Sequence, residues 1–257
     1  MTRSPDASAI RVDVDGPVAR ITLDRPERHN ALDAADVSGF RRTLDDIDAN
    51  HAVRVLVLTG AGESTFCSGA SLDQMRTGEM SGALFDTLTD RLANLRVPTI
   101  CRLNGSAYGG GAELALCCDL RIGVTGMRLS VPAAALGVCY PLGGLSRYVQ
   151  RLGLPAASRI LLAAEELDGP QLVGIGFLTR LVEPEALDET VDALTDRIAS
   201  LAPLAVTSMK RILLDIVSHA VEPGEAQRLI DRCAASDDLR EGLAARSEGR
   251  KPRFRGE

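Results

Sequence analysis

Two glycine-bearing segments carry the residues best suited to chemistry. The first reads Thr-Phe-Cys-Ser-Gly-Ala-Ser-Leu over residues 65–72. The second reads Asn-Gly-Ser-Ala-Tyr-Gly-Gly-Gly-Ala-Glu-Leu-Ala over residues 104–115. Each places glycine where an expected strand ends, so that backbone N–H groups can approach a ligand without obstruction by a side chain. These two segments are therefore the first candidates for a binding or catalytic site.

Glu113 is the titratable residue of the second segment. Three consecutive glycines, residues 109–111, open an expected helix, and the carboxylate follows one turn later. The first N–H groups of a helix are unpaired and its dipole favours negative charge there. A carboxylate beside such an anion-binding helix start could transfer a proton to or from a bound ligand. The residues alone leave the alternative open that the glycines serve tight packing and that Glu113 is an ordinary charge at a helix N-terminus.

Other constellations that could do chemistry are weaker. Residues 60–65 follow a strand but lack the third glycine of a dinucleotide fingerprint and the Gly-Lys of a P-loop, which indicates a simple turn. Ser68 and Ser71 do not occupy a G-x-S-x-G elbow, so a serine hydrolase fits poorly. The six cysteines show no C-x-x-C spacing and the three histidines stand alone, so we expect no metal site.

The elements that would position these segments alternate along the first part of the chain. Residues 19–23, 53–58, 98–103 and 120–124 read as strands, and residues 31–49 and 110–118 as helices. After about residue 145 apolar residues recur at helical spacing, as they do over 191–201. Residues 129–146 contain no charge but hold prolines and glycines, which favours a buried loop beside a site over a membrane span. The pattern predicts an α/β core followed by a helical layer.

Composition limits the possible partners. The 257 residues make one large domain or two small ones, with 29 basic against 35 acidic residues and a net charge of −6. A protein that binds nucleic acid or a membrane surface is usually basic, so we expect neither partner. The N-terminus lacks the apolar stretch of a signal peptide and the cysteines show no disulfide framework. We therefore expect a cytoplasmic protein.

A third segment, at residues 23–32, reads Leu-Asp-Arg-Pro-Glu-Arg-His-Asn-Ala-Leu. Together the three segments resemble the enoyl-CoA hydratase/isomerase (crotonase) superfamily. The resemblance extends to the tail at residues 249–256. It implies the α/β ClpP/crotonase-like fold, with a spiral of ββα units over residues 1–195 and a C-terminal helical trimerisation region over 196–257. It also implies a homotrimer or a dimer of trimers that acts on acyl-CoA thioesters. Coenzyme A then arrives as part of the substrate, and no cofactor is expected to be bound permanently.

The same resemblance implies roles for particular residues. The N–H groups of Ala70 and Gly110 are expected to form an oxyanion hole for the thioester carbonyl. The coenzyme A path is expected to be lined by residues of the first two motifs, namely Arg25, Arg28, His29, Ser68, Ala70, Ser71 and Leu72. Lys251 and Phe254 in the tail of a neighbouring subunit would reach the same cofactor. The alternative for these two residues is an exposed, solvated terminus.

The sequence departs from the family pattern at the second catalytic position. Glu113 matches the first catalytic glutamate of family hydratases, whereas Ala133 stands where the second is expected. Hydration needs one group to act as base and another as acid, so efficient hydration is in doubt. Ser71 replaces a usual aspartate, which weakens the match only slightly. Tyr140 lies in a Leu-Gly-Val-Cys-Tyr stretch that resembles a loop of family decarboxylases, although it could also be a buried tyrosine bonded to a backbone carbonyl.

Three functions are consistent with these residues. The first is an enoyl-CoA hydratase or isomerase with Glu113 as its single acid/base, since an isomerase needs only one group to move a proton. The second is a decarboxylase of malonyl-type thioesters that uses Tyr140. The third is an acyl-CoA binding protein with little catalysis. The sequence indicates neither the length nor the substitution of the acyl chain.

Overall fold

The protein is described by a computed structural model over residues 9–257, and a six-stranded sheet forms its centre. The strand order is β1-β2-β3-β5-β7-β10, with β1 antiparallel to β2 and all other neighbours parallel. The strands are β1 (Ile10–Asp15), β2 (Val18–Leu23), β3 (Val55–Gly60), β5 (Thr99–Leu103), β7 (Leu120–Val124) and β10 (Arg180–Val182). Because β3 is covered on both faces, its residues 55–58 form a continuous buried apolar run.

A second sheet of four short strands continues the main one. Its strands, in the order β4-β6-β8-β9, are β4 (Thr65–Cys67), β6 (Ser106–Tyr108), β8 (Arg128–Ser130) and β9 (Leu167–Asp168). Each of β3, β5 and β7 in the large sheet is followed directly by a short strand of the small sheet and then by a helix. This repeated ββα unit is the spiral that the family resemblance implied, and the prediction of the fold class is confirmed.

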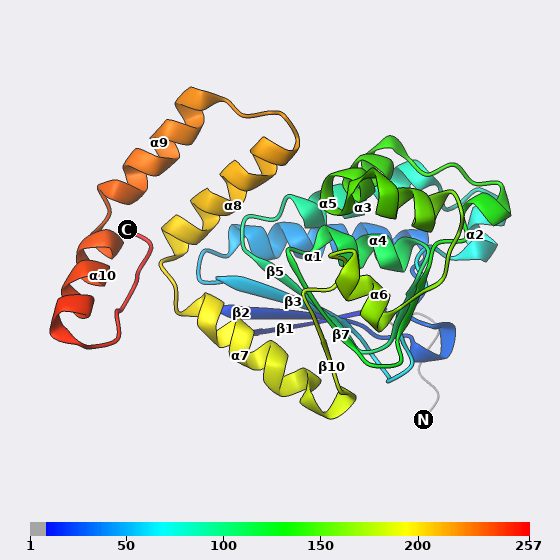
Figure 1. Ribbon diagram of the computed structural model, residues 1–257, viewed down its shortest axis with the longest axis horizontal. Helices are drawn as coiled ribbons and strands as arrows, with labels where there is room; N and C mark the ends of the chain where they lie inside the picture. The colour runs from blue at the N-terminus through cyan, green and yellow to red at the C-terminus, as the bar shows by residue number, and fades with distance from the viewer. Residues whose placement is uncertain (1–8) are drawn as a thin grey trace.

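Helices cover both faces of the large sheet. In Figure 1 α1, α3, α4 and α5 lie on one side of the strands and α7 lies on the other. Helix α4 is the most central, since residues 111–117 are all buried. The helices are α1 (Ala34–Ala49), α2 (Leu72–Thr77), α3 (Gly82–Ala93), α4 (Gly110–Cys117), α5 (Leu142–Leu161), α6 (Gly169–Gly174), α7 (Leu187–Ala199), α8 (Pro203–Val217), α9 (Pro223–Ala234) and α10 (Asp237–Glu248).

Two predicted segments differ from the structure in informative ways. The helix expected over 31–49 begins at Ala34, because Asp33 and Asp36 form a capping box that ends the preceding turn. The uncharged stretch 129–146 does lie beside a cavity, but residues 134–137 are exposed rather than buried. Helix α5 begins at Leu142, so the last part of this stretch is helical.

Helices α8, α9 and α10 lie together beyond the sheet, as Figure 1 shows at the orange and red end of the chain. Helix α7 packs against β3, β5 and β7 and runs through residue 195, where the sequence predicted a division of the chain. Helix α8 exposes Met209, Leu213 and Ile216 on its surface. Within residues 9–257, no helix combines the length and the apolar character that crossing a bilayer would require.

Candidate active site

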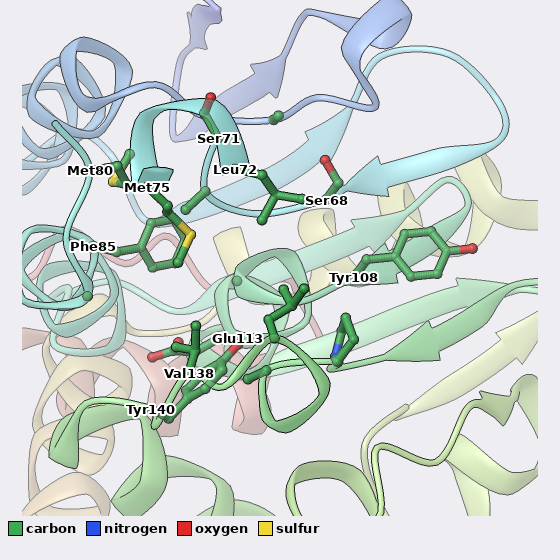
Figure 2. Close-up of a pocket in the computed structure, with 18 of the residues that line it drawn as sticks. Ser68, Ser71, Leu72, Met75, Met80, Phe85, Tyr108, Glu113, Val138 and Tyr140 are labelled. Atoms are coloured by element: carbon green, nitrogen blue, oxygen red, sulfur yellow. The ribbon is translucent and has the colours of Figure 1, made fainter. Parts of the chain in front are cut away.

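A cavity of about 800 Å³ lies between the segments that the sequence singled out and further parts of the chain. Its walls come from the turn at residues 28–31, the loop at 68–73, helix α3, residues 108–113 and the stretch 132–141. Figure 2 shows Glu113, Val138 and Tyr140 grouped on one side, and Ser68, Ser71 and Leu72 on the other. The apolar side chains of Met75, Met80 and Phe85 also line it.

The first candidate oxyanion donor is the N–H of Ala70. Residue Leu32 forms a parallel bridge with Ala70, in which the Leu32 N–H donates to the Gly69 carbonyl at 2.8 Å. The Ser71 N–H donates to the Leu32 carbonyl at 2.9 Å. This pattern uses the groups on either side of Ala70 and leaves its own N–H out of the pairing. Ala70 lines the cavity, so this donor is available to a ligand there.

The second candidate donor is the N–H of Gly110, the first residue of α4. At this position an N–H has no partner within the helix. Gly109 precedes it with φ 51° and ψ −123°, a conformation that a residue with a β-carbon adopts only with strain. The Gly109 N–H donates to the Ser130 carbonyl at 2.9 Å, which fixes this turn to the small sheet.

The two donor segments touch backbone to backbone. A β-carbon placed on Gly69 would lie 2.5 Å from the Gly110 nitrogen, and one placed on Gly111 would lie 2.1 Å from the Cys67 carbonyl oxygen. Glycine is therefore required at both positions for the loops to approach so closely. Because Gly69 precedes Ala70, this contact brings the two candidate N–H donors to the same wall of the cavity.

Two buried asparagines hold these loops in place. The Asn30 amide donates to the carbonyls of Ala61, Thr65 and Phe66 at 3.0, 2.9 and 3.0 Å. The Asn104 side chain accepts from the Gly60 N–H at 3.1 Å. Both side chains thus replace the water that the backbone groups would otherwise bind.

Glu113 lies three residues after Gly110 in the same cavity and is only 3% exposed. Burial raises the pKa of its carboxyl to about 7, although the neighbouring Arg147 lowers it. The Arg147 guanidinium donates to Glu113 Oε1 at 2.6 Å and, through its other terminal nitrogen, to Asp90. A carboxyl with a pKa near neutrality can both accept and donate a proton.

Position 133 contributes no acid to the site. Ala133 is buried in the cavity wall, and its methyl side chain offers neither a proton donor nor an acceptor. Tyr140 does line the cavity, and its ring packs edge-on against Tyr148 with centroids 6.1 Å apart. Burial raises the pKa of the Tyr140 phenol, which therefore keeps its proton at neutral pH. Within residues 9–257 its hydroxyl bonds to no backbone carbonyl.

Most of the residues expected along the coenzyme A path do line the cavity. They are Arg28, His29, Ser68, Ala70, Ser71 and Leu72. Arg25 does not line it, because its guanidinium is held by Asp36 at 2.6 Å and Asp33 at 3.0 Å. Arg28 donates to Asp33 at 3.1 Å and keeps 44% of its side chain exposed.

The two tail residues lie outside the cavity of their own chain. Phe254 sits against Gly242 of α10, and its carbonyl accepts from the Arg54 guanidinium at 2.7 Å. Lys251 is exposed beside α10, where its carbonyl accepts from Arg250. The expectation for these residues concerned a neighbouring subunit, and it stays a prediction.

Sequence reasoning missed the contribution of α3 to the site. Phe85 and Asp86 line the cavity, and the Asp90 carboxylate of the same helix holds Arg147. The signal was present in the apolar spacing of Phe85, Leu88 and Leu92, which marks one face of a helix. That this face meets α4 and α5 depends on the tertiary fold.

A search of family models matches residues 13–257 to the enoyl-CoA hydratase/isomerase family. The chain belongs to this family. Among curated relatives, the short-chain-enoyl-CoA hydratase of Clostridium acetobutylicum is 30% identical, covering 92% of this chain and 94% of that protein. The 2,3-dehydroadipyl-CoA hydratase of Escherichia coli is 31% identical, with 93% and 95% covered. The match to this family confirms the resemblance that the motifs indicated.

Solved structures agree with this assignment. An enoyl-CoA hydratase/carnithine racemase from Magnetospirillum magneticum superimposes with a TM-score of 0.93, at 29% identity, over 98% of this chain and 97% of that one. This chain is therefore similar to a solved member of the family over nearly its whole length.

Proposed function

We propose that this hydratase/isomerase transfers protons on enoyl-CoA thioesters, with Glu113 as the acid/base group and the N–H groups of Ala70 and Gly110 as the oxyanion hole. One observation carries the proposal. A buried carboxyl with a pKa of about 7 lies one helical turn from an unpaired N–H in the same cavity. The Glu113 carboxyl and the Gly110 N–H are thus close enough to act on neighbouring atoms of one bound thioester.

The chemistry follows from these positions. The two N–H groups bind the thioester oxygen and stabilise the negative charge of an enolate. Preorganised donors of this kind lower a barrier by about 3–4 kcal/mol each. Glu113 then removes or returns a proton on the carbon chain beside the carbonyl. A shift of the double bond along the chain needs one such group, so Ala133 does not obstruct isomerisation.

Coenzyme A is assigned to the side of the cavity formed by the turn at 28–31 and the loop at 68–72. Arg28 offers a partly exposed cation there for the phosphates of the cofactor. Met75, Met80 and Phe85 offer an apolar wall for the acyl chain. No permanently bound cofactor enters this proposal. The proposal also places the enzyme in the cytoplasm.

The proposal extends to assembly through the C-terminal helices. Met209, Leu213 and Ile216 recur at helical spacing on the exposed surface of α8, and water-exposed apolar rows of this kind favour association. We propose a homotrimer, alone or paired into a hexamer. The division of the chain into a core over 1–195 and a helical region over 196–257 belongs to the same proposal. Lys251 and Phe254 would then meet coenzyme A in the adjoining subunit.

A second candidate function rests on Tyr140. Tyr140 lines the cavity, and its neutral hydroxyl makes no hydrogen bond to another residue within 9–257, so it could hold a substrate carboxylate or protonate an enolate. This favours a decarboxylase of malonyl-type thioesters. A decarboxylase would depend on Tyr140 and would tolerate loss of the Glu113 charge.

The test follows the absorbance of crotonyl-CoA and of a 3-enoyl-CoA with the wild type, Glu113→Gln and the exposed control Glu189→Gln. We expect turnover of at least one thioester, a loss of about 10²–10⁴-fold in Glu113→Gln, and no change in the control. Release of carbon dioxide from malonyl-CoA that is lost in Tyr140→Phe would support the second candidate. Binding of every thioester without turnover would show an acyl-CoA binding protein and overturn both.

A further inference from the structure

We propose that Asp86 is a second proton-transfer carboxylate in the cavity, so that this chain holds two carboxylates although residue 133 is alanine. Two carboxylates are what addition of water to an enoyl thioester requires, so the inference specifies hydration. It rests on the proposed function, because it assumes that the thioester binds at Ala70 and Gly110.

Asp86 lies on α3 and faces the same cavity as Glu113. Its Oδ1 atom is buried and has no hydrogen-bond partner among the residues that the structure describes. A buried carboxylate oxygen without a donor costs free energy, and native proteins rarely keep one without a reason. Asp86 itself lines the cavity, where a small movement of its side chain would let a water molecule or a bound ligand satisfy this oxygen.

The first turn of α5 contacts both carboxylates. A β-carbon placed on Gly143 would lie 2.6 Å from Asp86 Oδ1, and one placed on Gly144 would lie 3.0 Å from Glu113 Oε1. Two consecutive glycines of α5 thus each make room for one carboxylate. A larger residue at either position would displace the acid beside it from its present place.

The charges around the pair fit proton transfer. Arg147 follows one turn later on α5 and binds Glu113 and Asp90, which places one cation between the acids of α3 and α4. Burial raises the pKa of the Asp86 carboxyl, and the nearby Asp90 raises it further. Asp86 also helps to raise the pKa of Glu113. Repulsion between two such groups favours a state in which one of them carries a proton.

This state suits the addition of water. One carboxylate takes a proton from the water whose oxygen bonds to the β-carbon, while the π electrons move toward the carbonyl. The other carboxylic acid gives its proton to the α-carbon, and the 3-hydroxyacyl thioester is complete. The proton gained by the first group replaces the one lost by the second, directly or through solvent. Water and thioester are the only reactants consumed.

The experiment compares Asp86→Asn and Asp86→Leu with Glu189→Gln. Glu189 is an exposed glutamate of α7 that does not line the cavity. We expect hydration of crotonyl-CoA to fall by about 10²–10⁴-fold in both Asp86 variants and to stay within about twofold in Glu189→Gln. Affinity for the saturated butyryl-CoA, measured by calorimetry, should change by less than about threefold.

Thermal unfolding separates a catalytic from a structural role. Asparagine has nearly the same shape as aspartate and carries no charge, so Asp86→Asn should melt at the wild-type temperature or above it. A variant that melts lower shows that the carboxylate stabilises the fold and overturns the inference.

Other outcomes are also decisive. Hydration retained in Asp86→Asn within about threefold, or an equal loss in Glu189→Gln, would refute a direct role for Asp86. A wild type that isomerises 3-enoyl-CoA without hydrating crotonyl-CoA would refute this inference and leave the proposed function standing. A wild type that turns over no enoyl thioester would refute both.

Discussion

The ion pair between Arg147 and Glu113 leads to a prediction about pH dependence. Burial raises the pKa of Glu113 to about 7, and Arg147 is the main group that opposes this rise. The two side chains are joined by a hydrogen bond of 2.6 Å and are both almost fully buried. Replacing Arg147 with methionine removes the cation while keeping much of the packing, so the pKa of Glu113 should rise further.

The size of this effect follows from the contact. A cation at this distance lowers a carboxyl pKa by about 1–3, so Glu113 in Arg147→Met should titrate between about pH 8 and pH 10. At pH 8 its ionised fraction would fall from about 90% to between about 50% and about 1%. For a reaction in which Glu113 acts as base, the low-pH limb of kcat/KM therefore moves to higher pH.

The assay is a pH profile of kcat/KM for isomerisation of a 3-enoyl-CoA between pH 5 and 10. The control is Arg151→Met, which removes the same side chain one turn further along α5, where no bond to Glu113 is made. Activity that is restored at high pH identifies a shifted titration. A low-pH limb that stays at pH 7 in Arg147→Met would refute the role given to Arg147.

Three further predictions concern the loops and cysteines. Gly69→Ala should abolish turnover and lower the free energy of unfolding in urea, because its β-carbon would meet Gly110. The control Gly126→Ala has a similar φ but open space around it, so it should lower the free energy of unfolding by only about 1–2 kcal/mol. Equal effects would contradict the packing argument. Asn30→Ala should cost at least about 1–3 kcal/mol by the same measurement, because the buried carbonyls of Thr65 and Phe66 lose this donor. Burial raises the pKa of the Cys67 thiol to about 12, so this thiol should not react with iodoacetamide in the native protein. Mass spectrometry should find the label on exposed Cys139 in the native protein and on Cys67 only after unfolding.

The α/β core and its helical layer were predictable because the strands and glycines follow local rules, whereas the spiral of ββα units came from the family resemblance. The apolar run of β3 and the glycines before α4 mark their elements without reference to the rest of the chain. Gly110 and Glu113 could be singled out as candidates for the same reason, since both lie in one short motif. That both line one cavity with Ala133 is what the structure adds.

The remaining parts of the site depend on contacts between distant helices. Arg147 meets Glu113 across 34 positions of sequence, and nothing local distinguishes it from the other arginines. Asp86 looks like an ordinary surface charge until α3 is packed against α4 and α5. Arg25 looked like a cofactor ligand because it belongs to the right motif, but two aspartates on the far side of its turn hold it.

The backbone contact between Gly69 and Gly110 has a consequence for how this enzyme can diverge. The groups assigned to the thioester oxygen belong to the main chain, so no exchange of side chains can remove them without also breaking a loop contact. The groups proposed to face the acyl chain are side chains from other segments, such as Met75, Met80 and Phe85. Selection can therefore change the acyl group that is accepted, one residue at a time, while the activation of the thioester is inherited unchanged.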